Sequence, residues 1–189
     1  MLALVAGTIV GTIGTLIHVA GLDPLEHIYD PYAYFALTVL VGRTAVGFGW
    51  ALLSTTLAAL APVIPALVGA GLAEHDIDAL GGDPTTLNIL IVVLLGFGLV
   101  AYVARSLGLL GDVAAGVICG VLLADVGGRA LPGLPDTVPA FRPWPALVVT
   151  LLVLGLLAAM RRTPGARLRA LAVALVIAAC YVLSLALTN

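Results

Sequence analysis

The sequence of 189 residues contains no lysine and no glutamine, and charged residues make up only 10% of the chain. The absence of lysine excludes Schiff-base chemistry on a lysine, the chemistry of retinal proteins. All eight basic residues are arginine and the net charge is −2, so the sequence offers no basic surface of the kind that binds nucleic acid. Soluble domains carry about a quarter charged residues, and this scarcity of charge therefore excludes an ordinary water-soluble fold.

Cysteine is also scarce. The two cysteines, Cys119 and Cys180, each lie inside an apolar run, where they are expected to act as small buried hydrophobic residues. Neither a disulfide framework nor a Cys-x-x-Cys metal site is indicated, and no cofactor is predicted. The N-terminal run 2–21 lacks the basic first region and the cleavage site of a signal peptide, which predicts a retained first span.

Apolar residues make up 62% of the chain, and the mean hydropathy is +1.21. A membrane-spanning helix needs about 17–25 mainly apolar residues. Five runs meet this requirement: 2–21, 87–105, 109–126, 145–160 and 169–187. The sequence therefore predicts an all-α polytopic transmembrane bundle, formed by a single domain over residues 1–189, with the lipid bilayer as its first partner.

The stretch 33–73 decides the number of spans. Its length is too great for one span and suits two, 33–54 and 56–73, joined by a turn at the Ser-Thr-Thr of residues 54–56. This division gives seven spans, and Pro62 and Pro65 would then kink or break the third helix. The alternative, one span followed by a re-entrant segment, gives six.

The arginines predict the orientation in the cell membrane. The segment 161–169 holds four arginines in a short loop, which the positive-inside rule places in the cytoplasm. Counting spans backwards then puts the loops 127–144 and 74–86 outside. The loop 22–32 shares that external side only if 33–73 crosses the membrane twice.

The first predicted helix has one face of small residues that ends in a histidine. Gly7, Gly11, Gly14 and His18 follow helical spacing, and small residues at such spacing let helix backbones approach closely. The pattern predicts a helix-packing face with His18 turned toward the bundle interior. There His18 would be a satisfied packing residue or, alternatively, a ligand or proton carrier.

Arg43 is the most informative single residue of the predicted spans. Within a span 33–54 it falls near mid-membrane, where a guanidinium costs at least ~2.5–3.5 kcal/mol unless it is paired or hydrated. Asp112 and Asp125, both in the run 109–126, are its candidate partners. Arg43 and one of these carboxylates would form either an ion pair that fixes the helix register or a site that handles anions or protons.

Two acidic segments repeat a Glu-His pair: "EHIYD" at 26–30 and "EHDID" at 74–78. Their ligand-type residues are Glu26, His27, Asp30, Glu74, His75 and Asp78. They are either solvated loops with Asp-Pro turns or, if the loops share a face, one outer-surface acid and histidine site. No metal-binding signature is present, and no metal is therefore predicted. In the less favoured alternative, a metal ion would be bound by His27 and His75.

Three functions remain open from the sequence. The leading hypothesis is a small transport-type membrane protein: a channel, a carrier or the membrane subunit of a larger transporter. A second is an intramembrane enzyme acting on a lipid or isoprenoid, with Glu26, Asp30, Glu74 and Asp78 as general acids and bases. A third is a non-catalytic assembly subunit, whose glycine faces dock on partner membrane subunits or on further copies of the chain.

Overall fold

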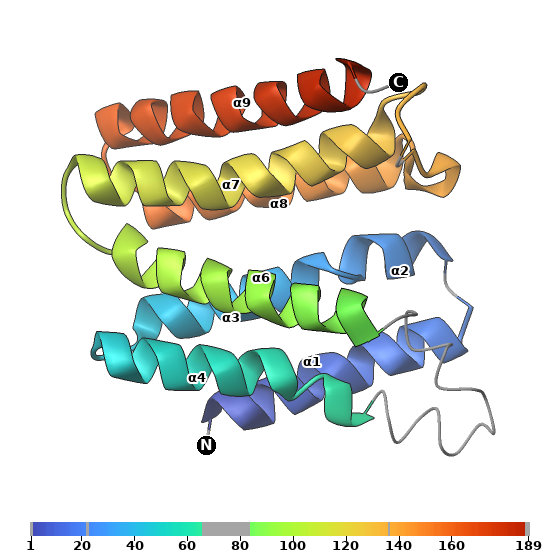
Figure 1. Ribbon diagram of the computed structural model, residues 1–189, viewed down its shortest axis with the longest axis horizontal. Coiled ribbons are helices and arrows are strands. Elements are labelled where there is room, and N and C mark those ends of the chain that lie inside the picture. Colours follow the sequence, from blue (N-terminus) through green and yellow to red (C-terminus); the bar gives the residue numbers. More distant parts are fainter. Residues whose placement is uncertain (1, 22, 66–83, 136, 188–189) are drawn as a thin grey trace. The chain divides into compact units, whose positions relative to one another are not determined.

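The computed structural model describes residues 2–21, 23–65, 84–135 and 137–187, and its regular structure in these ranges is helical (Figure 1). The expected all-α class is therefore confirmed for this part of the chain. The elements are α1 (Leu2–Val19), α2 (Asp23–Tyr29), α3 (Tyr32–Thr44), α4 (Phe48–Leu60), α6 (Pro84–Ala104), α7 (Leu109–Ala130), the 3-10 helix η2 (Pro139–Phe141), α8 (Trp144–Met160) and α9 (Pro164–Leu187). They group into two compact units, the N-terminal unit 1–102 and the C-terminal unit 103–189.

Within the described ranges, four helices are long and apolar enough to cross a membrane. They are Leu2–Val19, Phe48–Pro65, Leu109–Ala130 and Pro164–Leu187, and two shorter apolar helices, Asn88–Ala104 and Trp144–Met160, accompany them. At about 1.5 Å per residue, the longer ones reach about 30 Å, the thickness of the hydrocarbon core. The chain thus has the build of a multi-pass membrane protein.

In the N-terminal unit, the stretch after residue 32 forms two helices, α3 and α4, that pack against each other in opposite directions (Figure 1). The chain turns at Ala45–Gly47, where both end residues have extended backbone angles. The turn expected at 54–56 is wrong, because these residues lie within α4. Thr56, for example, donates its hydroxyl to the carbonyl of Leu52 at 2.8 Å. Hydroxyls bonded in this way to the preceding turn need no loop, and so the Ser-Thr-Thr sequence did not mark one.

The loop expected at 22–32 is largely helical, since α2 occupies Asp23–Tyr29. Proline is well suited to the first turn of a helix, where its missing N–H has no helical partner, and Pro24 holds such a place. Pro31 disfavours helical backbone at Asp30, and the chain breaks there before α3 begins at Tyr32. The segment containing Glu26 and His27 is therefore a short helix that leads directly into α3.

Helix α1 packs through two of its glycines. Gly7 and Gly11 are buried, and a Cβ added at Gly7 would lie 2.5 Å from the Cβ of Ala61. A Cβ at Gly11 would lie 2.7 Å from the Cα of Pro62. A Cβ at Gly14 would lie 2.6 Å from the hydroxyl oxygen of Tyr34. The glycine face therefore brings α1 against α3 and the end of α4, which terminates at Leu60, before Pro62.

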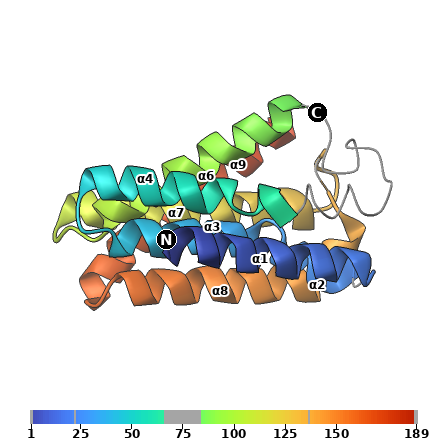
Figure 2. The same ribbon diagram turned by 90° about the horizontal axis from the view of Figure 1, so that it is seen from below.

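In the C-terminal unit, α7 packs against both α8 and α9, which contact each other far less (Figures 1 and 2). In the apolar stretch of α7, 61% of the residues are buried, whereas in that of α9 only 11% are buried. At the α7–α9 interface, glycines of α7 lie against alanines and β-branched residues of α9. A Cβ added at Gly116 would lie 2.7 Å from the carbonyl oxygen of Ala170, and one at Gly120 would lie 3.0 Å from the Cα of Ala174. Helix α7 is therefore the core of this unit, while most of α9 remains available to lipid.

Candidate functional site

The most buried charge in the described residues is at the start of α7. The Asp112 side chain is 2% exposed, and its two carboxylate oxygens contact different arginines. Oδ1 lies 2.9 Å from Nε of Arg161, just after α8, and Oδ2 lies 2.7 Å from NH2 of Arg169 in the first turns of α9. This carboxylate therefore ties together three helix ends that are distant in sequence.

The Arg161 side chain is almost as buried as Asp112. Its NH1 donates to the backbone carbonyl of Ser106 at 3.0 Å, in the turn before α7. Arg167 bonds the carbonyl of Arg161 at 2.8 Å and that of Ala158 at 3.2 Å. Cations next to the last carbonyls of a helix are favoured by the helix dipole, and Arg167 meets α8 in this way. These contacts fix the conformation of the 161–169 segment.

The sequence-based expectation for Asp112 was an ion pair with Arg43. The structure gives its carboxylate two other partners, Arg161 and Arg169, which the sequence analysis had treated only as a topology signal. No local pattern reveals this pairing, because Arg169 is 57 residues from Asp112.

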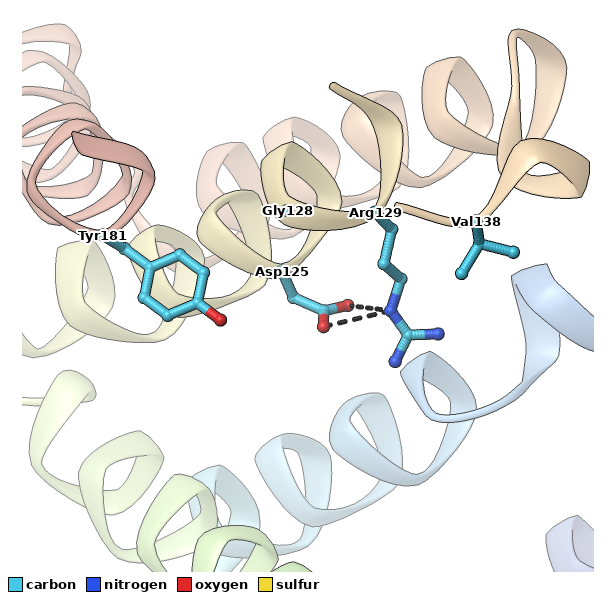
Figure 3. Close-up of a pocket in the computed structure, with 5 residues that line it drawn as sticks. All are labelled: Asp125, Gly128, Arg129, Val138 and Tyr181. Carbon is cyan, nitrogen blue, oxygen red and sulfur yellow. Dashed lines mark hydrogen bonds and ion pairs between the residues drawn. The ribbon is translucent and has the colours of Figure 1, made fainter. Parts of the chain in front are cut away.

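The second α7 carboxylate, Asp125, borders a pocket of about 270 Å³ (Figure 3). The pocket is lined by Asp125, Gly128, Arg129, Val138 and Tyr181. Asp125 accepts from Nε of Arg129 at 3.1 Å, an i, i+4 ion pair on one helix. The Tyr181 ring extends from α9 toward the carboxylate, so a phenol, a carboxylate and a guanidinium border the same space (Figure 3).

This pocket combines both signs of charge with a hydroxyl. The Asp125 side chain is 33% exposed, and it keeps acceptor capacity for a visiting donor while Arg129 supplies donors. Arg129 and Tyr181 were missed by the sequence analysis. Their signals were the i, i+4 spacing of Asp125 and Arg129, and a tyrosine near the end of the last apolar run.

Arg43 lies in the last turn of α3, which ends at Thr44, and it is half-buried. The expected position in the middle of a long helix is therefore wrong. The cause is the early turn at Ala45–Gly47, which places Arg43 beside a helix end.

The expectation that His18 faces the bundle interior is also wrong. Its side chain is 68% exposed, and Nδ1 lies 3.0 Å from Oε1 of Glu26 on α2. The chain reverses at Gly21, whose φ of 65° suits glycine, and this turn returns α2 toward the end of α1. Glu26 of the first Glu-His segment thus contacts His18, a histidine outside the segment.

Tyr29 provides a second link between α2 and α1. Its hydroxyl donates to the backbone carbonyl of Val10 at 2.7 Å. Of the other acid and histidine candidates on this segment, His27 is half-buried and Asp30 is exposed. Together the contacts of Glu26 with His18 and of Tyr29 with Val10 hold α2 along the second half of α1.

Among the described residues, no group of three or more His, Cys, Asp or Glu is placed to hold a metal ion. Glu74, His75 and Asp78 of the second segment lie outside the described residues. A site shared by the two Glu-His segments therefore stays a prediction.

Comparisons with known proteins give no relative: no protein-family model, no curated protein and no solved structure matches the chain. Its function must therefore be argued from its own residues.

Proposed function

We propose that the chain is a seven-span, transport-type protein of the cell membrane that conducts or carries a small charged solute. The observation that carries the proposal is the pocket at Asp125, where a carboxylate and a guanidinium on the apolar helix α7 border an opening. Ionisable groups within membrane segments are costly, and they typically mark pathways for ions or substrates.

The two α7 carboxylates have different roles in this proposal. Asp125 is partly exposed, pairs with Arg129 on its own helix and borders the pocket, so a solute in the pocket can exchange contacts with its carboxylate. Asp112 is enclosed by Arg161 and Arg169 and has no comparable freedom. We therefore assign the pathway to Asp125 and a structural role to Asp112. Roles for Arg43 and His18 in the pathway stay predictions.

Reconstitution of the full chain into liposomes tests the transport function. Proton, Na⁺, K⁺ and Cl⁻ fluxes would be recorded with ion-sensitive dyes under a potential set by valinomycin and a K⁺ gradient. We expect at least one ion to move faster than in protein-free liposomes. Asp125→Asn should lower that flux roughly tenfold or more, because a charge-assisted hydrogen bond is worth about 1.5–3 kcal/mol.

Glu26→Gln is the matched control, since it also removes one partly exposed carboxylate that contacts a side chain, but in the N-terminal unit. It should leave the flux unchanged. If none of the four ions moves faster than in protein-free liposomes, the transport proposal fails and an assembly subunit becomes the better reading.

The seven-span arrangement is supported by the antiparallel packing of α3 and α4, which turns 33–65 into two passes instead of one. Helix α3 has 13 residues, about 20 Å, and the exposed Asp30 lies just before its start, at the external end of this pass. In this arrangement the segment 161–169 is cytoplasmic, and the loops 127–144 and 74–86 are external.

Single-cysteine labelling tests this topology in a background with Cys119→Ala and Cys180→Ala. We expect Asp30→Cys and Asp78→Cys to react with an impermeant maleimide from outside the cell. Arg162→Cys should react only after the membrane is permeabilised. Labelling of Asp30→Cys and Asp78→Cys from opposite sides would overturn the seven-span arrangement.

A further inference from the structure

The arginine-rich end of the C-terminal unit forms a cationic surface with exposed leucines beside it. Five of the eight arginines of the chain lie in residues 103–115 and 157–170, together with a single carboxylate, Asp112. They are Arg105, Arg161, Arg162, Arg167 and Arg169. The ion pairs of Asp112 with Arg161 and Arg169 show that these segments meet at one end of the unit.

Asp112 cannot neutralise this surface. Its side chain is buried, and both of its oxygens are occupied by Arg161 and Arg169. Arg169 is nevertheless 53% exposed, and Arg105, Arg162 and Arg167 are exposed as well. Four guanidiniums therefore reach the surface, and Asp112, the single carboxylate of these segments, is buried beneath them, so the surface keeps a positive charge.

The leucines of the same end show what surrounds these cations. Leu107, in the turn before α7, is 97% exposed. Leu109 and Leu110, which begin α7, and Leu168, between Arg167 and Arg169, are exposed too. Exposed apolar side chains interleaved with arginines fit the interface of a bilayer, where acyl chains and headgroups lie within reach of one side-chain length.

We propose that this surface binds the headgroup of an anionic phospholipid, with Arg162 and Arg167 as its main contacts. A guanidinium offers paired N–H donors to phosphate oxygens, and basic sites between membrane helices bind phosphate-rich headgroups by this chemistry. Arg167 is already oriented by its bonds to the carbonyls of Ala158 and Arg161. The neighbouring leucines receive the acyl chains.

Native mass spectrometry of the purified full chain in non-ionic detergent tests the proposal. The protein would be titrated with dioleoyl phosphatidylglycerol and, separately, with zwitterionic dioleoyl phosphatidylcholine. We expect the anionic lipid to bind at least roughly tenfold more tightly, and less tightly as salt rises and screens the charges. Equal binding of the two lipids would overturn the proposal.

Variants locate the site. Arg162→Gln/Arg167→Gln should weaken phosphatidylglycerol binding by roughly twenty-five-fold, at about fivefold for each arginine lost. Arg142→Gln, at the other end of the unit, should leave the affinity unchanged. If the double variant does not fold, Arg162→Gln alone should still weaken binding by roughly fivefold.

An unchanged affinity in either Arg162 variant would place the lipid elsewhere and overturn the proposal. Competition with inorganic phosphate tests whether the arginines bind a lipid or any free phosphate ion. We expect 10-fold excess phosphate over lipid to leave phosphatidylglycerol bound, because phosphate lacks the acyl chains that contact the leucines. Complete displacement by phosphate would contradict a lipid-specific surface.

Discussion

The two ends of α7 hold the same functional group in opposite environments. Asp112, near the start, is 2% exposed and is bound by arginines that follow α8 and begin α9. Asp125, near the other end, is 33% exposed and is bound by Arg129 on its own helix. One carboxylate joins distant segments, whereas the other completes a local pair beside a pocket.

Burial explains the difference. A carboxylate removed from water loses several kcal/mol of hydration and must recover it from direct partners, so Asp112 needs two cations supplied by the tertiary fold. Asp125 is less buried, and Arg129 contacts it from one helical turn away. A charge that water still reaches can release its partner, which makes the Asp125 end the chemically adaptable one.

The largest expected effect comes from Asp112→Asn. The substitution leaves Arg161 buried without its anion, and breaking a buried ion pair on one side typically costs about 3–5 kcal/mol. The free energy of unfolding should fall by this amount, as measured by titrating the purified protein from mild detergent into dodecyl sulfate and following the helical circular dichroism.

Asp112→Leu/Arg161→Leu is the control for this prediction. Because it removes both buried charges, it should be more stable than Asp112→Asn. A single Asp112→Asn variant as stable as the parent would contradict the buried pair and, with it, the contrast between the two ends of α7.

Gly116→Leu should have the next largest effect, because Gly116 lies in the α7–α9 contact between the two ends. A side chain there meets the carbonyl oxygen of Ala170 at 2.7 Å from its Cβ. Overpacking of this kind costs about 1–3 kcal/mol. Gly155→Leu on α8 is the control, since nothing lies within 4 Å of its Cβ, and it should be close to neutral in the same unfolding titration.

Helical class and the long apolar runs could be predicted from the sequence because both depend on local composition. The turn after α3 could not, since Thr55 and Thr56 satisfy their hydroxyls within α4, and the sequence letters do not distinguish that from a loop. The pairing of Asp112 with Arg169 is a tertiary contact with no local signal. Asp125 could be predicted as a candidate because a carboxylate inside an apolar run is unusual. Its greater exposure compared with Asp112 depends on tertiary packing, which the sequence does not show.

Arg169→Gln should have a smaller effect than either change above. It removes one of the two partners of Asp112, but the Arg161 contact remains, and Arg169 is 53% exposed. Water can replace much of what is lost, so we expect a decrease of about 1 kcal/mol in the free energy of unfolding. Arg162→Gln, which changes an exposed neighbour, is the control. A loss as large as that of Asp112→Asn would show that Arg169, not Arg161, neutralises the carboxylate.

Asp125→Asn should have the smallest effect on stability. An i, i+4 pair on one helix contributes about 0.3–0.5 kcal/mol, and the amide can still bond to Arg129. The unfolding titration of this variant should therefore overlap that of the parent within about 0.5 kcal/mol. A decrease comparable to that of Asp112→Asn would contradict the accessible, local character of this pair. If Asp125→Asn keeps nearly parental stability but loses the ion flux, the two carboxylates of α7 have different functions. Asp125 would then be required for transport although it hardly stabilises the fold, whereas Asp112 stabilises the fold.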